Sequence, residues 1–390
     1  MSRSGVILLF EGLADTVVDA QVLLHARDMR RQGIADLSVW AVACSPKVHA
    51  LSLERLEAAR ERAEGRVHLL RGVAPTLPGS ARRNARRLLP WLRGQGQLEL
   101  VHARTDYAAE VASHLRGSRS FELIWDCRGD LEAEVRCRHA GTSPWRSALR
   151  AWQVHGARRR VRAAWVACDR AIFVTRALRE RLVGHALDER SEIIPGGADG
   201  RLFFFSPELR KRARAELGWP ESARVLVYSG SLASYQCFEE TVALFRRLHS
   251  QLPALRLLVV TPRPEAARPA LAGLPDDRYA LRSARLEEVN GWLNAADAAI
   301  MLRRPDPLNA VAFPTKFAEY GMVGLPVLMN DAVPEAAGVA REVGNFCPVV
   351  NGLAALPAEV DRVAIASAVR ERLSREALRE RYRRIYSSTS

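Results

Sequence analysis

Lysine is nearly missing from this sequence. Its 390 residues contain only Lys47, Lys211 and Lys316, while the other 55 of its 58 basic residues are arginine. Acidic residues number 44, so the formal net charge is +14. A GC-rich coding sequence that favours arginine codons accounts for the general shortage of lysine. A lysine that persists in this background is therefore a candidate for a specific role.

Long hydrophobic runs and paired cysteines are missing as well. No stretch approaches the roughly 20 apolar residues that a membrane-spanning helix needs. The run Val6–Phe10 is too short, and no small-residue cleavage site follows it, so we expect no signal peptide and a cytoplasmic protein. The six cysteines are scattered without a Cys-x-x-Cys pair, which argues against a zinc site or a disulfide framework.

Short apolar runs alternate with helical stretches along the chain, a pattern typical of α/β folds with parallel sheets. The segments between the runs predict helices, for example Asp19–Gln32 and Ser52–Glu64. In the first half we expect strands at Val6–Phe10, Leu37–Ala43, Val67–Leu70, Leu98–His102, Glu122–Asp126 and Ala171–Thr175.

A boundary is predicted at residues 191–206, where a short strand ends at Pro195-Gly196-Gly197. We expect Gly197 to adopt a positive φ. The second half then repeats the pattern of the first, and two doubly wound halves imply a ligand cleft between them. Strands are expected here at Arg224–Gly230, Leu255–Val260, Ala298–Leu302 and Leu325–Met329, and helices at Phe238–Ser250, Pro314–Val323 and 365–386.

The clearest motif begins at Pro314-Thr315-Lys316, where the pattern predicts the start of a helix. Proline suits the first turn, and a threonine hydroxyl can cap it or point outward. Free backbone N–H groups at such an end favour anions, phosphate above all. Lys316 adds a positive charge that the helix dipole disfavours there, and an anionic ligand would compensate for it. The segment therefore predicts a phosphate site.

Glu319 lies one turn beyond Thr315, on the same face of the predicted helix. Its carboxylate can accept two hydrogen bonds from a vicinal diol, such as the 2′- and 3′-hydroxyls of a ribose. Phosphate donors and a diol acceptor one turn apart describe a nucleotide-diphosphate site. For an isolated Lys-x-x-Glu, the alternative is an ordinary amphipathic helix whose charges are solvated.

The longer string around this motif favours the nucleotide site. Residues 314–327 resemble the Pro-Thr-Lys-x-x-Glu-Tyr-x-x-x-Gly-x-Pro-Val signature of the retaining family-4 glycosyltransferases, also called glycosyl transferases group 1. The resemblance implies the GT-B fold, an α/β fold of two Rossmann-like domains with doubly wound parallel sheets that face a central cleft. It also implies that Glu319 binds the donor ribose, and that the helix start at Pro314, Thr315 and Lys316 binds the diphosphate.

The same resemblance assigns the two halves of the chain. Residues 1–192 would form the acceptor domain and residues 193–369 the nucleotide-sugar donor domain, while a C-terminal helix at about 370–390 would pack back on the first. Two further segments resemble the family, Ile193–Phe203 at the junction and Cys168–Thr175 before it.

The sequence departs from the family at the predicted donor site. The first glutamate of the family's Glu-x₇-Glu motif would fall at Val311, so its contact with the sugar is absent or supplied elsewhere, for example by Asn309. The strand-end turn at Gly230-Ser231 matches the family better. Gly230 lets the backbone approach a phosphate, and Ser231 can donate a hydrogen bond, although a simple strand-end turn is an equal alternative.

The basic pair that often follows this turn in the family is missing. Ser231 and Gln236 stand where an arginine and a lysine are usual. The diphosphate would then be neutralised by other cations. Candidates are Lys316, Arg303 and Arg304.

In the first half, Asp126-Cys127-Arg128-Gly129 follows a predicted strand and resembles the family's Asp-x-His/Arg-Gly loop. Loops at this edge of a sheet usually carry ligands. We therefore assign catalytic roles to Arg128 and Lys316, with Arg128 meeting the donor phosphate or the acceptor. A surface salt bridge between Arg128 and a neighbouring acid is the alternative.

Two arginine-rich stretches surround tryptophans. Arg82–Arg93 holds five arginines around Trp91, and residues 136–168 hold Trp145 and Trp152 without any acid. A basic amphipathic helix with tryptophans can lie on an anionic membrane, which suits a lipid-linked acceptor. Core tryptophans beside a solvated arginine face are an equal alternative. We expect no nucleic-acid partner, because no motif for one occurs.

These features predict a retaining glycosyltransferase that moves a sugar from a UDP- or GDP-linked donor to a hydroxyl acceptor, a lipid-linked or growing surface glycan. We expect it to need no metal and no cofactor, and to work in the cytoplasm at the inner face of the membrane. Two alternatives stay open. One is a nucleotide-sugar epimerase on the same fold, and the other is a basic membrane- or nucleic-acid-binding protein with a degenerate cleft.

Overall fold

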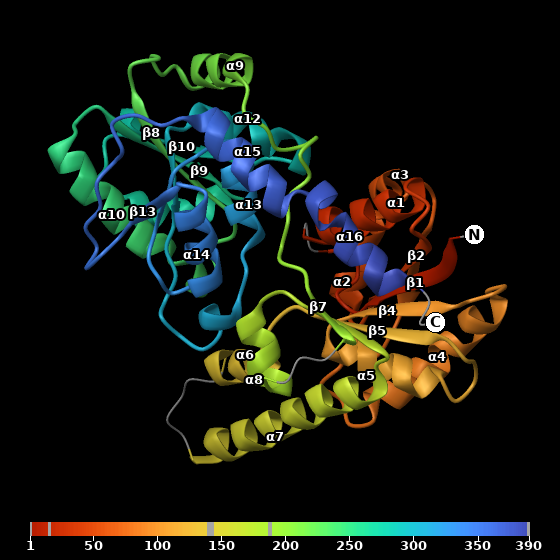
Figure 1. Ribbon diagram of the computed structural model, residues 1–390. Helices are drawn as coiled ribbons and strands as arrows, with labels where there is room; N and C mark the ends of the chain where they lie inside the picture. Colours follow the sequence, from red (N-terminus) through yellow and green to blue (C-terminus); the bar gives the residue numbers. More distant parts are fainter. Residues whose placement is uncertain (1, 15–16, 139–143, 186–188, 388–390) are drawn as a thin grey trace. The chain divides into compact units, whose positions relative to one another are not determined.

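The protein forms two α/β units in the computed structural model (Figure 1). The structure describes residues 2–14, 17–138, 144–185 and 189–387, and it describes no side chains within 138–150. Unit 1 comprises Met1–Ile194 together with Glu380–Ser390, and unit 2 comprises Pro195–Arg379. The sequence had placed this boundary between residues 192 and 193.

Unit 1 is built on a seven-stranded sheet with the order β3-β2-β1-β4-β5-β6-β7, in which every pair is parallel. This is the doubly wound arrangement, in which the chain starts in the middle and winds outward to each edge in turn. Its strands are β1 Arg3–Leu9, β2 Ala35–Ala43, β3 Val67–Arg71, β4 Leu100–Arg104, β5 Glu122–Cys127, β6 Arg170–Phe173 and β7 Ser191–Ile193.

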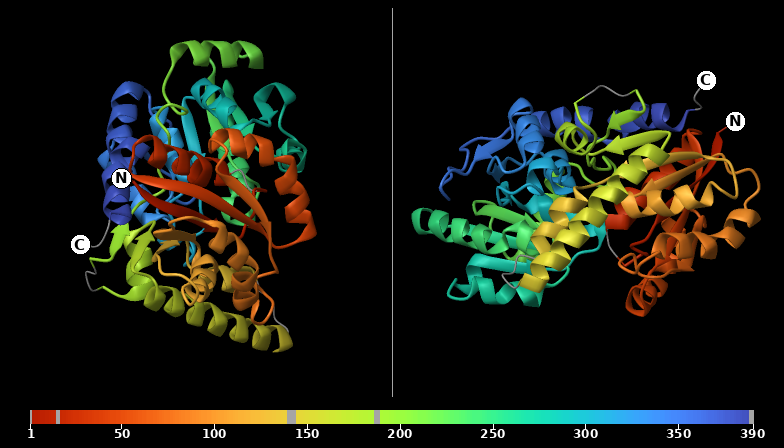
Figure 2. Two further views of the ribbon diagram at one scale, coloured as in Figure 1. Left: turned by 90° about the vertical axis from the view of Figure 1, so that its right-hand side faces the viewer. Right: turned by 90° about the horizontal axis from the view of Figure 1, so that it is seen from below.

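Helices connect these strands and cover the sheet, so its central strands are apolar on both faces. They are α1 Leu24–Arg31, α2 Pro46–Glu54, α3 Leu56–Arg62, α4 Ser80–Gly94, α5 Asp106–Leu115, α6 Leu131–Arg138, α7 Pro144–Ala167 and α8 Arg176–Val183, with the π-helix η1 Asp19–Leu23 before α1. The long α7 (yellow) runs along the outside of unit 1, where it packs on α5 and α6 (Figure 2).

Unit 2 repeats this plan with six parallel strands in the order β10-β9-β8-β11-β12-β13. Its strands are β8 Arg224–Ser229, β9 Leu255–Val260, β10 Tyr279–Arg282, β11 Ala298–Met301, β12 Val327–Met329 and β13 Phe346–Pro348. Its helices are α9 Pro207–Leu217, α10 Phe238–Gln251, α11 Pro264–Leu271, α12 Leu286–Ala295, α13 Thr315–Met322, α14 Pro334–Glu342 and α15 Arg362–Leu373, with short 3₁₀ turns η2 Ser234–Gln236, η3 Asp276–Arg278 and η4 Asn309–Val311. The last helix, α16 Arg375–Tyr386, begins in unit 2 and continues into unit 1 from Glu380.

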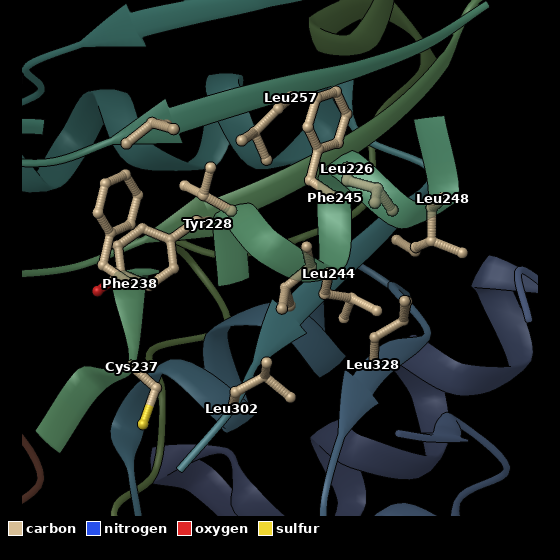
Figure 3. Packing of buried hydrophobic residues seen from close by; sticks show 14 of the residues in the cluster. Leu226, Tyr228, Cys237, Phe238, Leu244, Phe245, Leu248, Leu257, Leu302 and Leu328 are labelled. Atoms are coloured by element: carbon tan, nitrogen blue, oxygen red, sulfur yellow. The ribbon is translucent and has the colours of Figure 1, made fainter. Parts of the chain in front are cut away.

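The core of unit 2 forms where α10 lies on the sheet (Figure 3). Leu244, Phe245 and Leu248 of α10 are buried at helical spacing, as in an amphipathic helix with one inward face. They belong to the same cluster as Leu226 of β8 and Leu257 of β9. The apolar residues whose spacing predicted this helix are thus the residues that pack against the sheet.

Two helices expected as single segments are interrupted. Asp19–Gln32 starts as the π-helix η1 before α1, and Ser52–Glu64 is split between α2 and α3 at Arg55. The guanidinium of Arg55 donates a hydrogen bond to the carbonyl of Leu13 at 2.8 Å and pairs with Asp19. This long-range tie fixes the break, and no local pattern around residue 55 indicated it.

The predicted C-terminal helix 365–386 is also two helices, α15 and α16. Ser374 between them is extended, with φ −70° and ψ 155°, and its hydroxyl accepts the amide of Ala377 at 3.0 Å as the cap of α16. The break pairs with Ala198, whose N–H donates to the carbonyl of Leu373 at 3.0 Å and whose carbonyl accepts the N–H of Arg375 at 3.2 Å.

The expectation of a positive φ at Gly197 is wrong, because Gly197 is not among the glycines with that conformation. It is needed for another reason. A Cβ atom on Gly197 would lie 2.5 Å from the carbonyl oxygen of Leu373, which is backbone and cannot move aside. Glycine therefore allows the segment 195–199 to lie directly against the end of α15.

The C-terminal half of α16 belongs to unit 1 and lies beside α1 (Figure 1). The buried hydroxyl of Tyr386 is 2.8 Å from Nε2 of His25 and 2.8 Å from Nδ1 of His102. On its other side, His102 is 3.0 Å from the carboxylate of Asp126 at the end of β5. A buried polar chain thus links the last helix to the first and to the centre of the sheet.

Candidate functional site

The strand end at Ser229-Gly230 is held by a tyrosine from α13. The Tyr320 hydroxyl accepts a hydrogen bond from the amide of Ser229 at 2.9 Å and is 3.3 Å from its carbonyl oxygen. Tyr320 is fully buried, so this contact is shielded from water. Gly230 follows with φ 138°, a conformation that side-chain-bearing residues rarely adopt. Helix α13 and the end of β8 are therefore held together through Tyr320.

Lys316 lies buried next to this strand end. Its ammonium donates a hydrogen bond to Oε1 of Gln236 at 2.7 Å and lies 4.9 Å from the ring centre of Tyr228, a cation–π distance. A Cβ atom on Gly230 would be only 2.5 Å from Nζ, so the absence of a side chain there makes room for the lysine. Burial lowers the pKa of Lys316 well below its usual value, and the charge of Arg303 lowers it further.

Arg303 is a second buried cation, just beyond the end of β11. Its guanidinium donates to the carbonyl of Leu302 at 2.9 Å, and its backbone is held by the side-chain amide of Asn330. Burial lowers the pKa of Arg303 as well. Within the described part of the chain, neither Arg303 nor Lys316 forms a salt bridge with a carboxylate. The site thus holds two positive charges close to each other without direct neutralisation.

The start of α13 adds backbone donors. Pro314 is the N-cap residue, with φ −69° and ψ 125°, and Thr315 is the first helical residue, so the proline sits one position earlier than expected and the threonine does not cap the helix. The amides of Thr315 and Lys316 have no acceptor among the residues that the structure describes. Such amides at the first turn, together with the helix dipole, favour an anion.

Glu319 follows one turn later and is half-buried. Burial raises the pKa of its carboxyl to about 7, although the charge of Lys316 acts in the opposite direction. The carboxylate has no hydrogen-bond partner among the described residues. Its acceptor capacity is therefore available to a ligand.

Known proteins resemble this chain in fold and not in sequence. No protein-family model matches it, and no curated protein matches its sequence. Sucrose-phosphate synthase from Thermosynechococcus elongatus is 16% identical with a TM-score of 0.63, covering 98% of this chain and 92% of that one. Anabaena HepE in complex with UDP-glucose is 15% identical with a TM-score of 0.64, covering 97% of this chain and 98% of that one. WaaG, a glycosyltransferase involved in lipopolysaccharide biosynthesis, is 14% identical with a TM-score of 0.57, covering 98% of this chain and 94% of that one.

The chain has the GT-B fold. The fold class predicted from the sequence is therefore confirmed. The described residues of this GT-B chain include no helix long and apolar enough to span a bilayer, and they include no group of His, Cys, Asp or Glu side chains arranged to hold a metal ion.

Two predicted donor-site residues have structural partners. The backbone carbonyl of Ser231 accepts a hydrogen bond from the Tyr228 hydroxyl at 2.5 Å. Asn309 is buried, and its side-chain amide donates to the carbonyl of Arg304 at 3.0 Å while its backbone N–H donates to Asp306 at 2.8 Å. Asn309 thus holds the loop 304–309 in one conformation through two hydrogen bonds within the loop.

The two arginines proposed from the sequence beside Lys316 differ in their surroundings. Arg303 is buried and carries no salt bridge to a described acid, whereas Arg304 is exposed and pairs with Glu240 at 3.2 Å. Arg303 is therefore the stronger candidate for a phosphate contact. Sequence reasoning did not anticipate the roles of Gln236, Tyr228 and Tyr320, since only the fold brings their side chains to this strand end.

In unit 1 of the GT-B chain, Arg128 lies directly after β5. Its Nε donates to the carboxylate of Asp126 at 2.8 Å. The sequence left open a surface salt bridge with a neighbouring acid, but here the Asp126 carboxylate is buried. Burial by itself would lower the pKa of Arg128, but the charge of Asp126 outweighs burial and raises it. The same arginine also lines a cavity at this end of the sheet.

Proposed function

We propose that this protein is a glycosyltransferase that moves a sugar from a nucleoside-diphosphate sugar to a hydroxyl acceptor. The observation that carries the proposal is the pair of buried cations, Lys316 and Arg303, combined with free amides at the start of α13 and with Glu319 one turn later. A nucleoside diphosphate has anionic oxygens for the cations and amides, and a ribose diol for the carboxylate. HepE, which shares the fold, was solved in complex with UDP-glucose.

In this reaction the bond between C1 of the sugar and the diphosphate oxygen breaks, and C1 forms a bond to the acceptor oxygen. The acceptor proton leaves with the departing diphosphate. Lys316, Arg303 and the amides of α13 stabilise the negative charge that grows on that diphosphate. Arg128 is a further candidate for a contact with the donor phosphate or the acceptor.

We propose that the sugar keeps its anomeric configuration, because residues 314–327 resemble the signature of a retaining family. The anomeric proton coupling in the NMR spectrum of the product measures this directly. A product with the opposite configuration to the donor would overturn retention while leaving glycosyl transfer in place.

Calorimetry with UDP and GDP tests the donor site. We expect one of the two to bind the wild-type protein, and Lys316→Met and Glu319→Gln to weaken this binding by about tenfold to a hundredfold, since each removes a charged hydrogen-bonding group. Turnover of the matching nucleotide sugar should fall in parallel.

Lys211→Met and Glu239→Gln are matched controls, because both residues are exposed on other helices of unit 2, α9 and α10. They should bind nucleotide like the wild-type protein. Near-normal affinity in both Lys316→Met and Glu319→Gln would contradict the site assignment, and failure of every nucleotide to bind would favour a basic binding protein.

The acceptor is proposed to be a lipid-linked or growing surface glycan at an anionic membrane. The outer face of α4 presents Arg82, Arg83, Arg86, Arg87 and Arg93, all exposed, and Trp91 is 43% exposed beside them. Such a face suits the surface of an anionic bilayer. The side chain of Trp145, noted with α7, lies outside the described residues.

Sedimentation with vesicles tests this surface. We expect binding to phosphatidylglycerol vesicles but not to phosphatidylcholine vesicles, with binding weakened by salt. The double variant Arg86→Gln/Arg87→Gln should bind less than Lys47→Gln, which removes a single charge elsewhere in unit 1. Equal binding to both kinds of vesicle would contradict an electrostatic contact.

A further inference from the structure

A cavity of about 510 Å³ opens in unit 1, and most of its lining comes from the segments that follow β1, β4 and β5 and from α5, α6 and α7. The strand order changes direction between β1 and β4, and doubly wound sheets bind ligands outside this point. The volume lies within the range of about 300–1,000 Å³ that small-molecule sites occupy. Both its position and its size fit a substrate pocket.

The charges of the lining disfavour an anion. Its two arginines are already paired, Arg128 with Asp126 at 2.8 Å and Arg160 with Glu110 at 2.7 Å. Three carboxyl groups also line the cavity. They belong to Glu11, Asp106 and Glu134. Glu11 lies 3.7 Å from the buried Arg104, which is not among the lining residues.

Asp106 is a buried polar group in this lining. It begins α5, is only 6% exposed, and accepts a hydrogen bond from the indole N–H of Trp125 at 3.0 Å. It forms no salt bridge within the described part of the chain. A carboxyl group offers about four acceptor positions, so one indole leaves capacity for hydroxyl groups of a ligand.

Trp152 lines the same cavity from α7 and is 63% exposed. An aromatic side chain on a pocket wall offers a large apolar contact area to a ligand. Its flat apolar face complements the C–H face of a sugar ring, and the carboxyl groups in the same lining complement the hydroxyls. The lining thus combines an apolar surface with hydrogen-bond acceptors, and both of its arginines are already paired.

We propose that this cavity binds a neutral sugar ring, with Trp152 stacking on the ring and Asp106 accepting hydrogen bonds from its hydroxyls. This ring is the end of the acceptor glycan that receives the transferred sugar, an assignment that rests on the proposed transferase function. The acceptor class is then a neutral glycan terminus rather than a sugar phosphate or a phosphorylated headgroup.

Selective ¹⁵N labelling of the eight tryptophans gives an indole NMR signal for each, and the Trp152→Ala spectrum identifies the signal of Trp152. The probes are the methyl α-glycosides of glucose, galactose, mannose and N-acetylglucosamine, then maltose, then glucose 6-phosphate. We expect at least one neutral probe to shift the signal of Trp152 and that of Trp125, which contacts Asp106. The signals of Trp91, Trp219 and Trp292 should stay in place.

Trp152→Ala and Asp106→Asn should each weaken the binding of that probe by about tenfold, and the phosphorylated sugar should bind more weakly than its neutral counterpart. Trp91→Ala is the matched control, because Trp91 is also exposed in unit 1 but does not line the cavity. Tighter binding of maltose than of the methyl glycosides would show that the pocket takes a chain end and not only a free monosaccharide.

The proposal is overturned if no neutral probe shifts Trp152, if the phosphorylated sugar binds more tightly, or if both cavity variants bind like the wild-type protein. Calorimetry with UDP on the same samples separates this result from the transferase proposal. UDP binding without sugar binding would contradict the proposed acceptor pocket but not the donor site. Sugar binding without nucleotide binding would contradict the proposed donor site but not the sugar-binding pocket.

Discussion

Lys316 and Arg303 carry charges where burial disfavours them, which is why the pKa of each is lowered. A buried cation costs free energy unless it is paired or hydrogen-bonded. The groups in direct contact are Gln236, the ring of Tyr228 and a backbone carbonyl, all neutral, while the Glu319 carboxyl favours the charge of Lys316 without forming a salt bridge. A diphosphate would supply the missing negative charge, so we expect nucleotide to stabilise the protein against thermal unfolding.

Gly230→Ala tests how closely this lysine is fitted. The added Cβ would lie 2.5 Å from Nζ of Lys316, and φ 138° is unfavourable for alanine. Since the clashing atom ends a flexible side chain, we expect the protein to fold while UDP affinity falls at least about tenfold by calorimetry. Gly291→Ala in α12 is the control, because its Cβ meets no atom within 4 Å. Unchanged affinity in Gly230→Ala would contradict the close fit.

Glu319 makes donor binding depend on pH. Burial raises its pKa to about 7, so the group is protonated below that pH and offers fewer acceptors to a ribose diol. The contribution of Glu319 to UDP binding, taken as the difference between the wild-type protein and Glu319→Gln, should therefore strengthen as pH rises through about 7 and level off above it. Calorimetry of UDP between about pH 6.5 and 8.5 measures this. The Glu319→Gln variant corrects for the ligand, whose terminal phosphate titrates near 6; an equal pH slope in both proteins would exclude Glu319 as the cause.

At the scale of elements, sequence periodicity predicted the strands that are buried on both faces and the amphipathic α10. It did not predict where helices break, because Arg55 and Ser374 are fixed by partners far along the chain, Leu13 and Ala198. The edge strands β10 and β13 were also missed. They have four and three residues, too few for a repeating pattern.

The docking of α16 depends on one hydroxyl group. Tyr386→Phe leaves His25 and His102 without the oxygen that bridges them at 2.8 Å from each, inside the core of unit 1. An unsatisfied buried polar group costs about 1–3 kcal/mol. For a unit of this size we expect the melting temperature to fall by a few degrees, about 2–4 °C per kcal/mol.

Tyr279→Phe is the matched control, because the Tyr279 hydroxyl meets Asp276 at an exposed position at 3.1 Å. It should melt like the wild-type protein in differential scanning fluorimetry. If Tyr386→Phe also melts at the wild-type temperature, the polar chain contributes nothing to the docking of α16.

At the scale of the whole molecule, the repeated alternation of apolar runs and helices was enough to predict two doubly wound sheets. The helix start at Pro314–Lys316 and the turn at Gly230 were also visible as motifs, since their chemistry is local. The contacts of Tyr320 and Gln236 with this site could not be predicted from the sequence, because they join segments about 80 to 90 residues apart. The cavity beside Asp106 could not be predicted either, because it forms only where the ends of three strands meet.

The charge of the donor site leads to a prediction about metal. Lys316, Arg303 and the amides of α13 provide positive charge from the protein itself, as a divalent cation would in other transferases. We therefore expect UDP binding and sugar transfer to proceed in excess EDTA at the untreated rate. Loss of turnover in EDTA that returns with Mg²⁺ or Mn²⁺ would contradict this expectation.

The crossing of α16 from unit 2 into unit 1 sets an order of maturation during synthesis. The contacts of Tyr386 with His25 and His102 can form only after residues 380–387 leave the ribosome, whereas the segment 195–379 is complete before that point. At about 5–20 residues per second, the first unit waits on the order of ten seconds or more for its last helix. The half of the protein that is made first is therefore the half that is finished last.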